Sequence, residues 1–289
     1  MRPTALLAVL LPVVLAVSGC GIRSEPTGAI PAFPVQLVDG LGRTVTIDHQ
    51  PQRVLSFDGG LSRTVTAVGA AAELVQVPAG LSATDTTRIE SLRPDLVLLP
   101  AGESAAGADA LSHTLGIPVY VASYGSVAAI EHDAGQLGLA TGRSAAGGAL
   151  VARMSTEVAA LRRALRGRPP TPVFLDAGLL IPVPQTQLLD DLLRTADGTD
   201  VAAGAGSSQP FPAARLRAAA PQAFVAIQGR GTTLKSLRES AATRTLPAVR
   251  SGRFVALSAI DLTDPGPAVV ATLEALARVL HPGAVPSAG

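Results

Sequence analysis

Polar, charged and aromatic side chains recur in this sequence in or shortly after short apolar runs. Such runs, closed by glycine, proline or aspartate, are typical of buried strands, and the carboxyl ends of parallel strands meet at one edge of a sheet. Side chains there can converge on a bound solute. We therefore expect ligand contacts from Phe57, Asp58, Arg63, Glu103 and Tyr124 in the first half of the chain, and from Asp176, Gln209, Phe211, Gln228, Arg230 and Asp261 in the second half.

Two of these candidates, Arg63 and Arg230, carry guanidinium groups. A guanidinium presents a planar fork of N–H donors that suits carboxylate or phosphate oxygens, so the pair indicates an anionic ligand. The alternative is that each arginine is solvated or pairs with a neighbouring carboxylate.

The motifs of common catalytic and metal sites do not occur. There is no G-x-S-x-G turn, phosphate-binding loop or H-E-x-x-H pair, and Asp190 and Asp191 are consecutive, so they do not face each other as an acid–base pair would. The four histidines are dispersed and the chain has one cysteine, so no side-chain metal site is expected. With 23 basic and 22 acidic residues, the chain offers no electrostatic basis for nucleic-acid binding. We expect neither an enzyme nor a resident cofactor or metal.

The amino-terminal residues resemble a bacterial lipoprotein signal. An apolar stretch over residues 5–17 is too short to span the roughly 30 Å of a bilayer core, and it closes with small residues before Cys20. We expect a signal peptide over residues 1–19, lipidation of Cys20 and a flexible tether over residues 20–34. The mature chain would then be anchored on the extracytoplasmic face of the cell membrane. The alternative is an ordinary secretory leader with an incidental cysteine.

The elements that would position the candidate residues fall into two similar halves. A hairpin is predicted over residues 35–47 and a helix over residues 62–72 with Ser62 as its cap. Apolar runs that predict strands occur in the same order in both halves, at 53–57, 95–99 and 117–123, and again at 172–176, 223–227 and 253–258. A last helix is predicted over residues 267–280. Strands alternating with helices indicate small parallel sheets.

A long amphipathic helix is predicted between the halves, over residues 143–166. Its apolar residues recur at three- and four-residue steps, and at about 1.5 Å per residue it is long enough to join two lobes. The predicted fold is α/β, with two Rossmann-like lobes (residues 35–142 and 168–289) joined by one helix over residues 143–167. Two such sheets facing each other would define a ligand cleft.

The ordered motifs DGLGRTVTI, PQRVLSF, TAVGAAAELVQV, IESLRPDLVLLPAG, LGIPVYVAS and LGLATGR resemble the bacterial extracytoplasmic solute-binding proteins that serve ABC importers of iron siderophores, haem or cobalamin. The resemblance runs from about Val35 to His281. It implies a monomer that captures a small metal chelate, such as an iron siderophore, between its lobes. The chelate would be presented to a membrane permease without any chemistry.

The sequence departs from that family at two places. Better-known members carry a glutamate in each lobe that docks on permease arginines, and the corresponding positions are about Thr87 and Ala214. Neither is acidic, although Glu90 lies one turn beyond the first. Permease docking is therefore in question. The competing hypothesis is an envelope lipoprotein that uses the two-lobed scaffold for protein interaction.

Tyr124 has two interpretations. A phenolate can ligate haem iron, whereas a surface tyrosine can simply cover the lobe with its ring. The chain has 3% aromatic residues and no tryptophan, which argues against a large planar ligand, because such pockets generally use aromatic and apolar walls.

Overall fold

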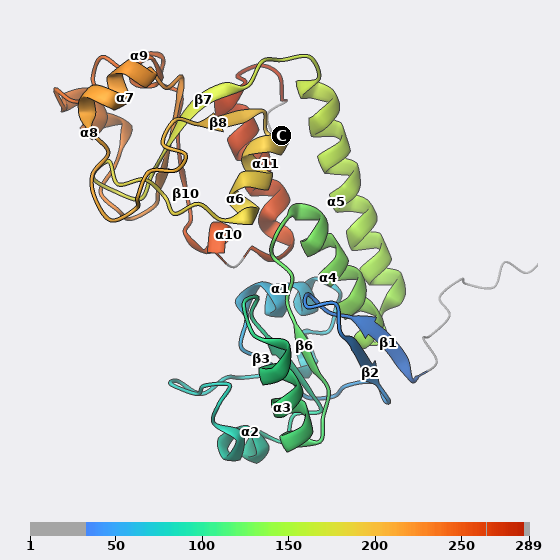
Figure 1. The fold of residues 1–289 in the computed structure, drawn as a ribbon. Coiled ribbons are helices and arrows are strands. Elements are labelled where there is room, and N and C mark those ends of the chain that lie inside the picture. Colours follow the sequence, from blue (N-terminus) through green and yellow to red (C-terminus); the bar gives the residue numbers. More distant parts are fainter. Residues whose placement is uncertain (1–32, 264, 286–289) are drawn as a thin grey trace, which may run out of the picture.

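The computed structural model describes residues 33–263 and 265–285, which form two α/β lobes beside one long helix (Figure 1). The expected signal peptide, Cys20 and nearly all of the tether lie outside the described residues. Within the described ranges, no helix combines the length and apolar character that a membrane crossing requires.

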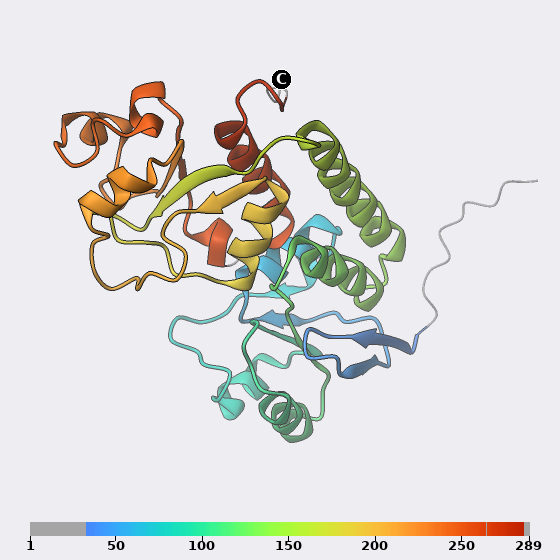
Figure 2. The same cartoon turned by 45° about the horizontal axis from the view of Figure 1, so that its top comes forward.

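The first lobe is built on a parallel sheet with strand order β4-β3-β5-β6. Every residue of its three longer strands is buried, as expected for a sheet covered on both faces. The antiparallel hairpin of β1 (Val35–Val38) and β2 (Thr44–Ile47) stands beside it (Figure 2). The other elements are β3 (Val54–Ser56), α1 (Gly59–Ala67), η1 (Ala71–Glu73), β4 (Leu74–Val75), α2 (Thr86–Leu92), β5 (Leu96–Leu99), α3 (Ala105–Leu115), β6 (Val119–Val121) and α4 (Val127–Ala140).

The second lobe repeats this topology with strand order β10-β9-β7-β8. In both sheets the first strand lies between the second and the third, and the fourth follows the third. The repeat predicted from the sequence is confirmed, but the short edge strands β4 and β8 were not predicted, because two or three residues carry no periodicity. The elements are β7 (Thr171–Asp176), α6 (Gln187–Thr195), β8 (Gly198–Asp200), α7 (Ala213–Ala219), β9 (Ala223–Ile227), α8 (Leu234–Glu239), α9 (Pro247–Ser251), β10 (Phe254–Leu257), α10 (Ile260–Thr263), η2 (Gly266–Ala268) and α11 (Val269–Leu280).

The same backbone corner precedes the third strand of each sheet. Helix α2 is closed by Arg93 with φ 49°, and helix α7 by Ala220 with φ 44°. Each of these left-handed residues is followed by a proline, which disfavours helical backbone for the residue before it. Both helices therefore end there and the chain turns into its buried strand.

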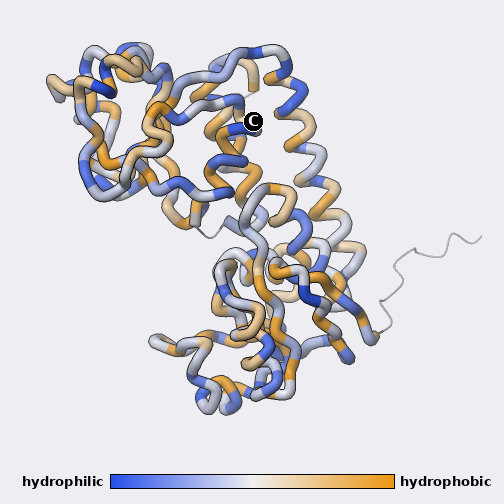
Figure 3. Tube along the Cα trace, viewed as in Figure 1, coloured by the Kyte–Doolittle hydropathy of each residue, from blue (hydrophilic) through white to orange (hydrophobic). Residues whose placement is uncertain are grey.

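Helix α5 (Ser144–Leu165) lies along one side of both lobes (Figures 1 and 2). Its predicted apolar stripe is confirmed, and hydrophobic and hydrophilic residues alternate along it (Figure 3). The helix packs against α4 of the first lobe and α11 of the second. At the α4 contact, a Cβ on Gly147 would stand 2.9 Å from the Cα of Gly138, so the two backbones touch.

The start of α1 differs from the prediction. The helix covers Gly59–Ala67, and its cap is Asp58 rather than Ser62, because the Asp58 carboxylate accepts a hydrogen bond from the Leu61 N–H at 2.6 Å. Gly59 and Gly60, which precede the predicted helix, are its first two residues. Ser62 lies in its first turns and donates its hydroxyl to the Asp58 carbonyl.

The two lobes also touch beside α5. A Cβ on Gly266 would stand 2.8 Å from the Gly60 carbonyl oxygen, which places η2 against the start of α1. The Val127 N–H, at the start of α4, donates to the Asp191 carboxylate of α6 at 3.0 Å. The lobes are therefore tied together by backbone contacts as well as by the connecting helix.

The glycines at the start of α5 provide a matched test of this packing. We expect Gly147→Ala to lower the free energy of unfolding by about 1–3 kcal/mol, since the added methyl group forces α4 and α5 apart. A methyl group added by Gly148→Ala would meet open space on the same helix. This change should raise the free energy of unfolding by up to about 1 kcal/mol, because alanine has a higher helix propensity than glycine. Urea unfolding of the two variants measures both effects, and equal effects of the two changes would contradict the packing.

Candidate functional site

The wall of the first lobe at its strand ends is formed by Asp58 and Tyr124. Asp58 follows β3 and Tyr124 follows β6, and the Tyr124 hydroxyl donates a hydrogen bond to Asp58 Oδ1. The same oxygen caps α1. Asp58 is buried with 6% of its surface exposed, whereas Tyr124 is half-buried. A single carboxylate thus fixes the tyrosine and the start of the helix.

The turn that carries Tyr124 is held from behind by a second carboxylate. Asp133 of α4 accepts hydrogen bonds from the Tyr120 hydroxyl at 2.6 Å and from the Ser123 N–H at 2.8 Å. Burial raises the pKa of Asp133 to about 6, against the opposing effect of these two hydrogen bonds. Burial and the neighbouring Asp133 raise the pKa of Tyr120 well above its ordinary value.

A pocket of about 380 Å³ lies between the lobes at this wall. The first lobe contributes the ends of β5 and β6 and the tip of the hairpin, and the second lobe contributes the start of α6. Gly40 is required at the hairpin tip, because a Cβ there would stand 2.2 Å from the Ala122 carbonyl oxygen. The lining residues are Gly40, Leu41, Ala101, Gly102, Ala122, Ser123, Tyr124, Gly125, Thr186, Gln187 and Leu188.

Thr186 and Gln187 were missed by the sequence analysis. They follow no apolar run that predicts a strand, so the strand-end rule does not select them. The available signal was the cap of α6: the Thr186 hydroxyl accepts a hydrogen bond from the Leu189 N–H at 3.1 Å. A helix start that faces the other lobe is a second way to supply a cleft wall.

Two candidates of the second lobe, Asp176 and Phe211, are buried and contact other groups of the protein. Asp176 is fully buried, and its carboxylate accepts hydrogen bonds from the Gly178 N–H at 3.0 Å and the Thr232 hydroxyl at 2.5 Å. Burial raises the pKa of Asp176. Phe211 is 5% exposed and packs against Phe174 with 5.5 Å between ring centroids, so its ring is part of the hydrophobic core.

The remaining candidates differ in exposure. Gln209, Gln228 and Arg230 are exposed in loops of the second lobe, and Asp261 is half-buried on α10. In the first lobe Phe57, Arg63 and Glu103 are half-buried. Of all the candidates, only Tyr124 lines the pocket between the lobes. In the described part of the chain, no three acidic, histidine or cysteine side chains are grouped so that they could hold a metal ion.

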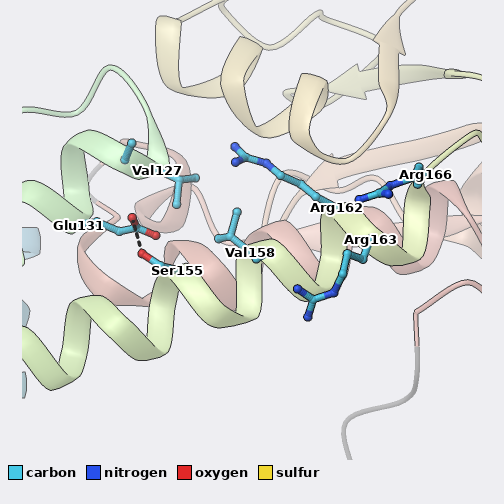
Figure 4. A pocket seen from close by; sticks show the side chains of 9 residues that line it. Val127, Glu131, Ser155, Val158, Arg162, Arg163 and Arg166 are labelled. Atoms are coloured by element: carbon cyan, nitrogen blue, oxygen red, sulfur yellow. Dashed lines mark hydrogen bonds between the residues drawn. The ribbon is translucent and has the colours of Figure 1, made fainter.

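A second groove, of about 390 Å³, lies between helices α4 and α5 (Figure 4). Arg162, Arg163 and Arg166 line it together with Glu131, which accepts a hydrogen bond from the Ser155 hydroxyl at 2.9 Å. The groove is lined by residues of α4 and α5 and by Arg166 directly after α5, and none of the loops at the strand ends lines it. We therefore place the candidate site at the pocket between the lobes.

The raised pKa of Asp133 makes stability depend on pH. Its folded pKa of about 6 exceeds the unfolded value of about 3.9, so the folded state binds the proton more tightly between these values. The stability contributed by this group is present below pH 4 and lost as the pH rises through 6. The loss is on the order of 1–3 kcal/mol.

Urea unfolding between pH 4 and 7 tests this dependence. Asp133→Asn should reduce the slope of the pH profile, whereas Asp48→Asn at an exposed position should leave it unchanged. An Asp133→Asn protein with the parent profile would contradict the assignment.

Comparison with known proteins identifies the fold and the family. A periplasmic solute-binding protein from Veillonella parvula aligns with a TM-score of 0.72 at 13% identity, covering 89% of each chain. Helicobacter pylori CeuE with bound Ni(II) gives 0.69 at 14%, covering 86% of this chain and 90% of CeuE. The periplasmic haem-binding protein RhuT from a Roseiflexus species gives 0.64 at 22%, covering 81% of this chain and 99% of RhuT.

At these identities the structural likeness shows a shared fold. No curated protein sequence matches the chain. The model of the periplasmic binding protein family, however, matches residues 60–260, which is more than half of the chain. The chain therefore belongs to the periplasmic binding protein family, whose members work outside the cytoplasm and bind ligands without catalysing their reaction.

Proposed function

We propose that this protein is a lipid-anchored solute receptor that captures a metal chelate between its lobes for an ABC importer. The observation that carries the proposal is the pocket of about 380 Å³ with walls from both lobes. A solute bound there contacts the strand ends of the first lobe and the start of α6 at once. A single bound solute would therefore bridge the two lobes.

The metal would arrive with its own ligands. The described residues do not group three metal-ligating side chains, so the protein is suited to recognise a complex rather than a bare ion. Two structural neighbours support this class of ligand: RhuT is a haem-binding protein, and CeuE was determined with Ni(II). An iron siderophore is the chelate we propose, and Arg230 is available for its anionic groups.

Anchoring would follow from the leader. Cys20 is the sole cysteine, and it follows small residues at the end of the apolar stretch. Lipidation at this thiol would supply enough acyl chains for stable membrane attachment.

We expect Cys20→Ser to move the expressed protein from the membrane fraction to the soluble extracytoplasmic fraction. The lost acyl chains remove the membrane affinity. Fractionation with mass determination of the mature amino terminus measures both changes. Continued membrane association of the unlipidated variant would contradict the anchor.

Docking to a permease would use the helices that precede the third strands. Thr87 and Ala214 are the second residues of α2 and α7, and both are exposed, so the two lobes present equivalent positions. Their lack of charge favours the second candidate function, an envelope lipoprotein that uses the lobes for protein interaction. Ligand binding separates the two functions.

Titration of the soluble chain with hemin, a ferric hydroxamate siderophore and Ni(II)–histidine tests the receptor. Binding of any probe at micromolar concentration is expected, and binding of none would overturn the proposed function. Gln187→Trp should weaken the bound probe roughly tenfold or more, because the larger side chain fills the pocket from the second lobe.

The matched control is Gln222→Trp, which adds the same side chain at an exposed position before β9, at the opposite edge of the sheet. It should bind as the parent does. Equal weakening by both changes would place the ligand elsewhere.

A further inference from the structure

Two large apolar side chains are exposed at the strand ends of the second lobe. Leu179, three residues beyond β7, has 79% of its surface exposed, and Ile260, three residues beyond β10, has 55% exposed. They are the two most exposed of the large hydrophobic residues in the described part of the chain. Figure 1 shows α10, which begins with Ile260, at the edge of the second lobe that faces the first.

The turn that carries Leu179 is sterically unfavourable. Leu179 has φ 57° and Leu180 has φ 63°, so two consecutive leucines adopt the left-handed region that L-residues rarely occupy. Leu180 packs against the buried cluster of the lobe, but Leu179 does not. Core packing therefore explains Leu180 and leaves the exposed Leu179 without a role in the fold.

The turn is nevertheless held rigidly. The buried Asp176 carboxylate binds the Gly178 N–H, and the Leu180 carbonyl accepts a hydrogen bond from the Phe211 N–H at 2.8 Å. Gly178 also lies against the next loop, since a Cβ there would stand 2.9 Å from the Arg230 carbonyl oxygen. A strained, exposed apolar residue that the surrounding structure over-determines is the pattern of a ligand contact.

Arg230 lies between the two apolar residues. It is exposed three residues beyond β9, the strand between β7 and β10. Within the described ranges, no carboxylate lies at ion-pair distance from its guanidinium. The strands that lead to Ile260, Arg230 and Leu179 are consecutive in the sheet, in the order β10-β9-β7, and neighbouring strands are about 4.8 Å apart.

We propose that Leu179 and Ile260 contact an apolar face of the transported ligand while Arg230 binds an anionic group on it. This inference rests on the proposed function, and it names the ligand class as an amphiphilic anion. A hydrophilic chelate would leave both apolar side chains against water. The contacts follow the carboxyl ends of β7, β9 and β10 on the second lobe, and they are separate from the residues that line the pocket at Tyr124 and Gln187.

Hemin serves as the probe, because it combines an apolar macrocycle with carboxylates, and Ni(II)–histidine serves as the hydrophilic comparison. Leu179→Gly should weaken hemin binding roughly tenfold, since it removes the burial of one leucine side chain. Glycine accepts a positive φ, so the variant should keep or raise the melting temperature. The double variant Leu179→Gly/Ile260→Ser should weaken hemin binding further. Arg230→Gln should reduce the salt dependence of hemin binding.

Val38→Thr is the matched control, because Val38 is exposed by 47% on the hairpin, away from the strand ends of the second lobe. It should bind hemin as the parent does. Hemin binding by Leu179→Gly/Ile260→Ser within twofold of the parent would overturn the inference. A parent chain that binds Ni(II)–histidine but not hemin would also overturn the inference and leave the receptor function intact. A parent chain that binds none of the three probes, hemin, Ni(II)–histidine and the siderophore, would overturn both.

Discussion

The hydrogen bonding of buried aspartates to backbone N–H groups holds the loops at the strand ends of both lobes. Asp58 binds the Leu61 N–H, Asp133 binds the Ser123 N–H and Asp176 binds the Gly178 N–H. A buried carboxylate is costly unless it is well hydrogen-bonded, and these bonds offset that cost. The loops that face the cleft are thereby fixed before any ligand arrives.

Because of this hydrogen bonding, Asp58 and Asp176 hold the loops in place, whereas the sequence suggested them as ligand contacts. An aspartate directly after a buried strand has the composition expected of a ligand contact, and Asp58 and Asp176 were selected for that reason. Both carboxylates accept hydrogen bonds from groups of the protein itself. What remains for the ligand is the surface that they position: the Tyr124 ring on the first lobe and the turn with Leu179 on the second.

The overall fold was predictable because its signals repeat. Apolar runs before glycine and proline mark the buried strands of both halves, and the stripe on α5 has the helical period. The candidate site was predictable only in part. Tyr124 is at a strand end and was found, whereas Gln187 reaches the pocket from a helix start, which depends on how the lobes are oriented. Phe211 was selected by the strand-end rule together with the loop before it, but its apolar ring is buried in the core.

The connection between the lobes favours ligand selectivity that depends on the polar and apolar groups exposed on the walls of the site. A single helix packed backbone to backbone at Gly138 and Gly147 cannot bend sharply without losing that contact. The approach of Gly266 to Gly60 and the bond from Val127 to Asp191 brace the lobes further. Because a movement of one lobe against the other would disturb these contacts, we expect the existing walls to fit their solute without wide closure. A preformed site of this kind discriminates between ligands through the polar and apolar groups it leaves exposed, since mismatched groups remain desolvated and unpaired.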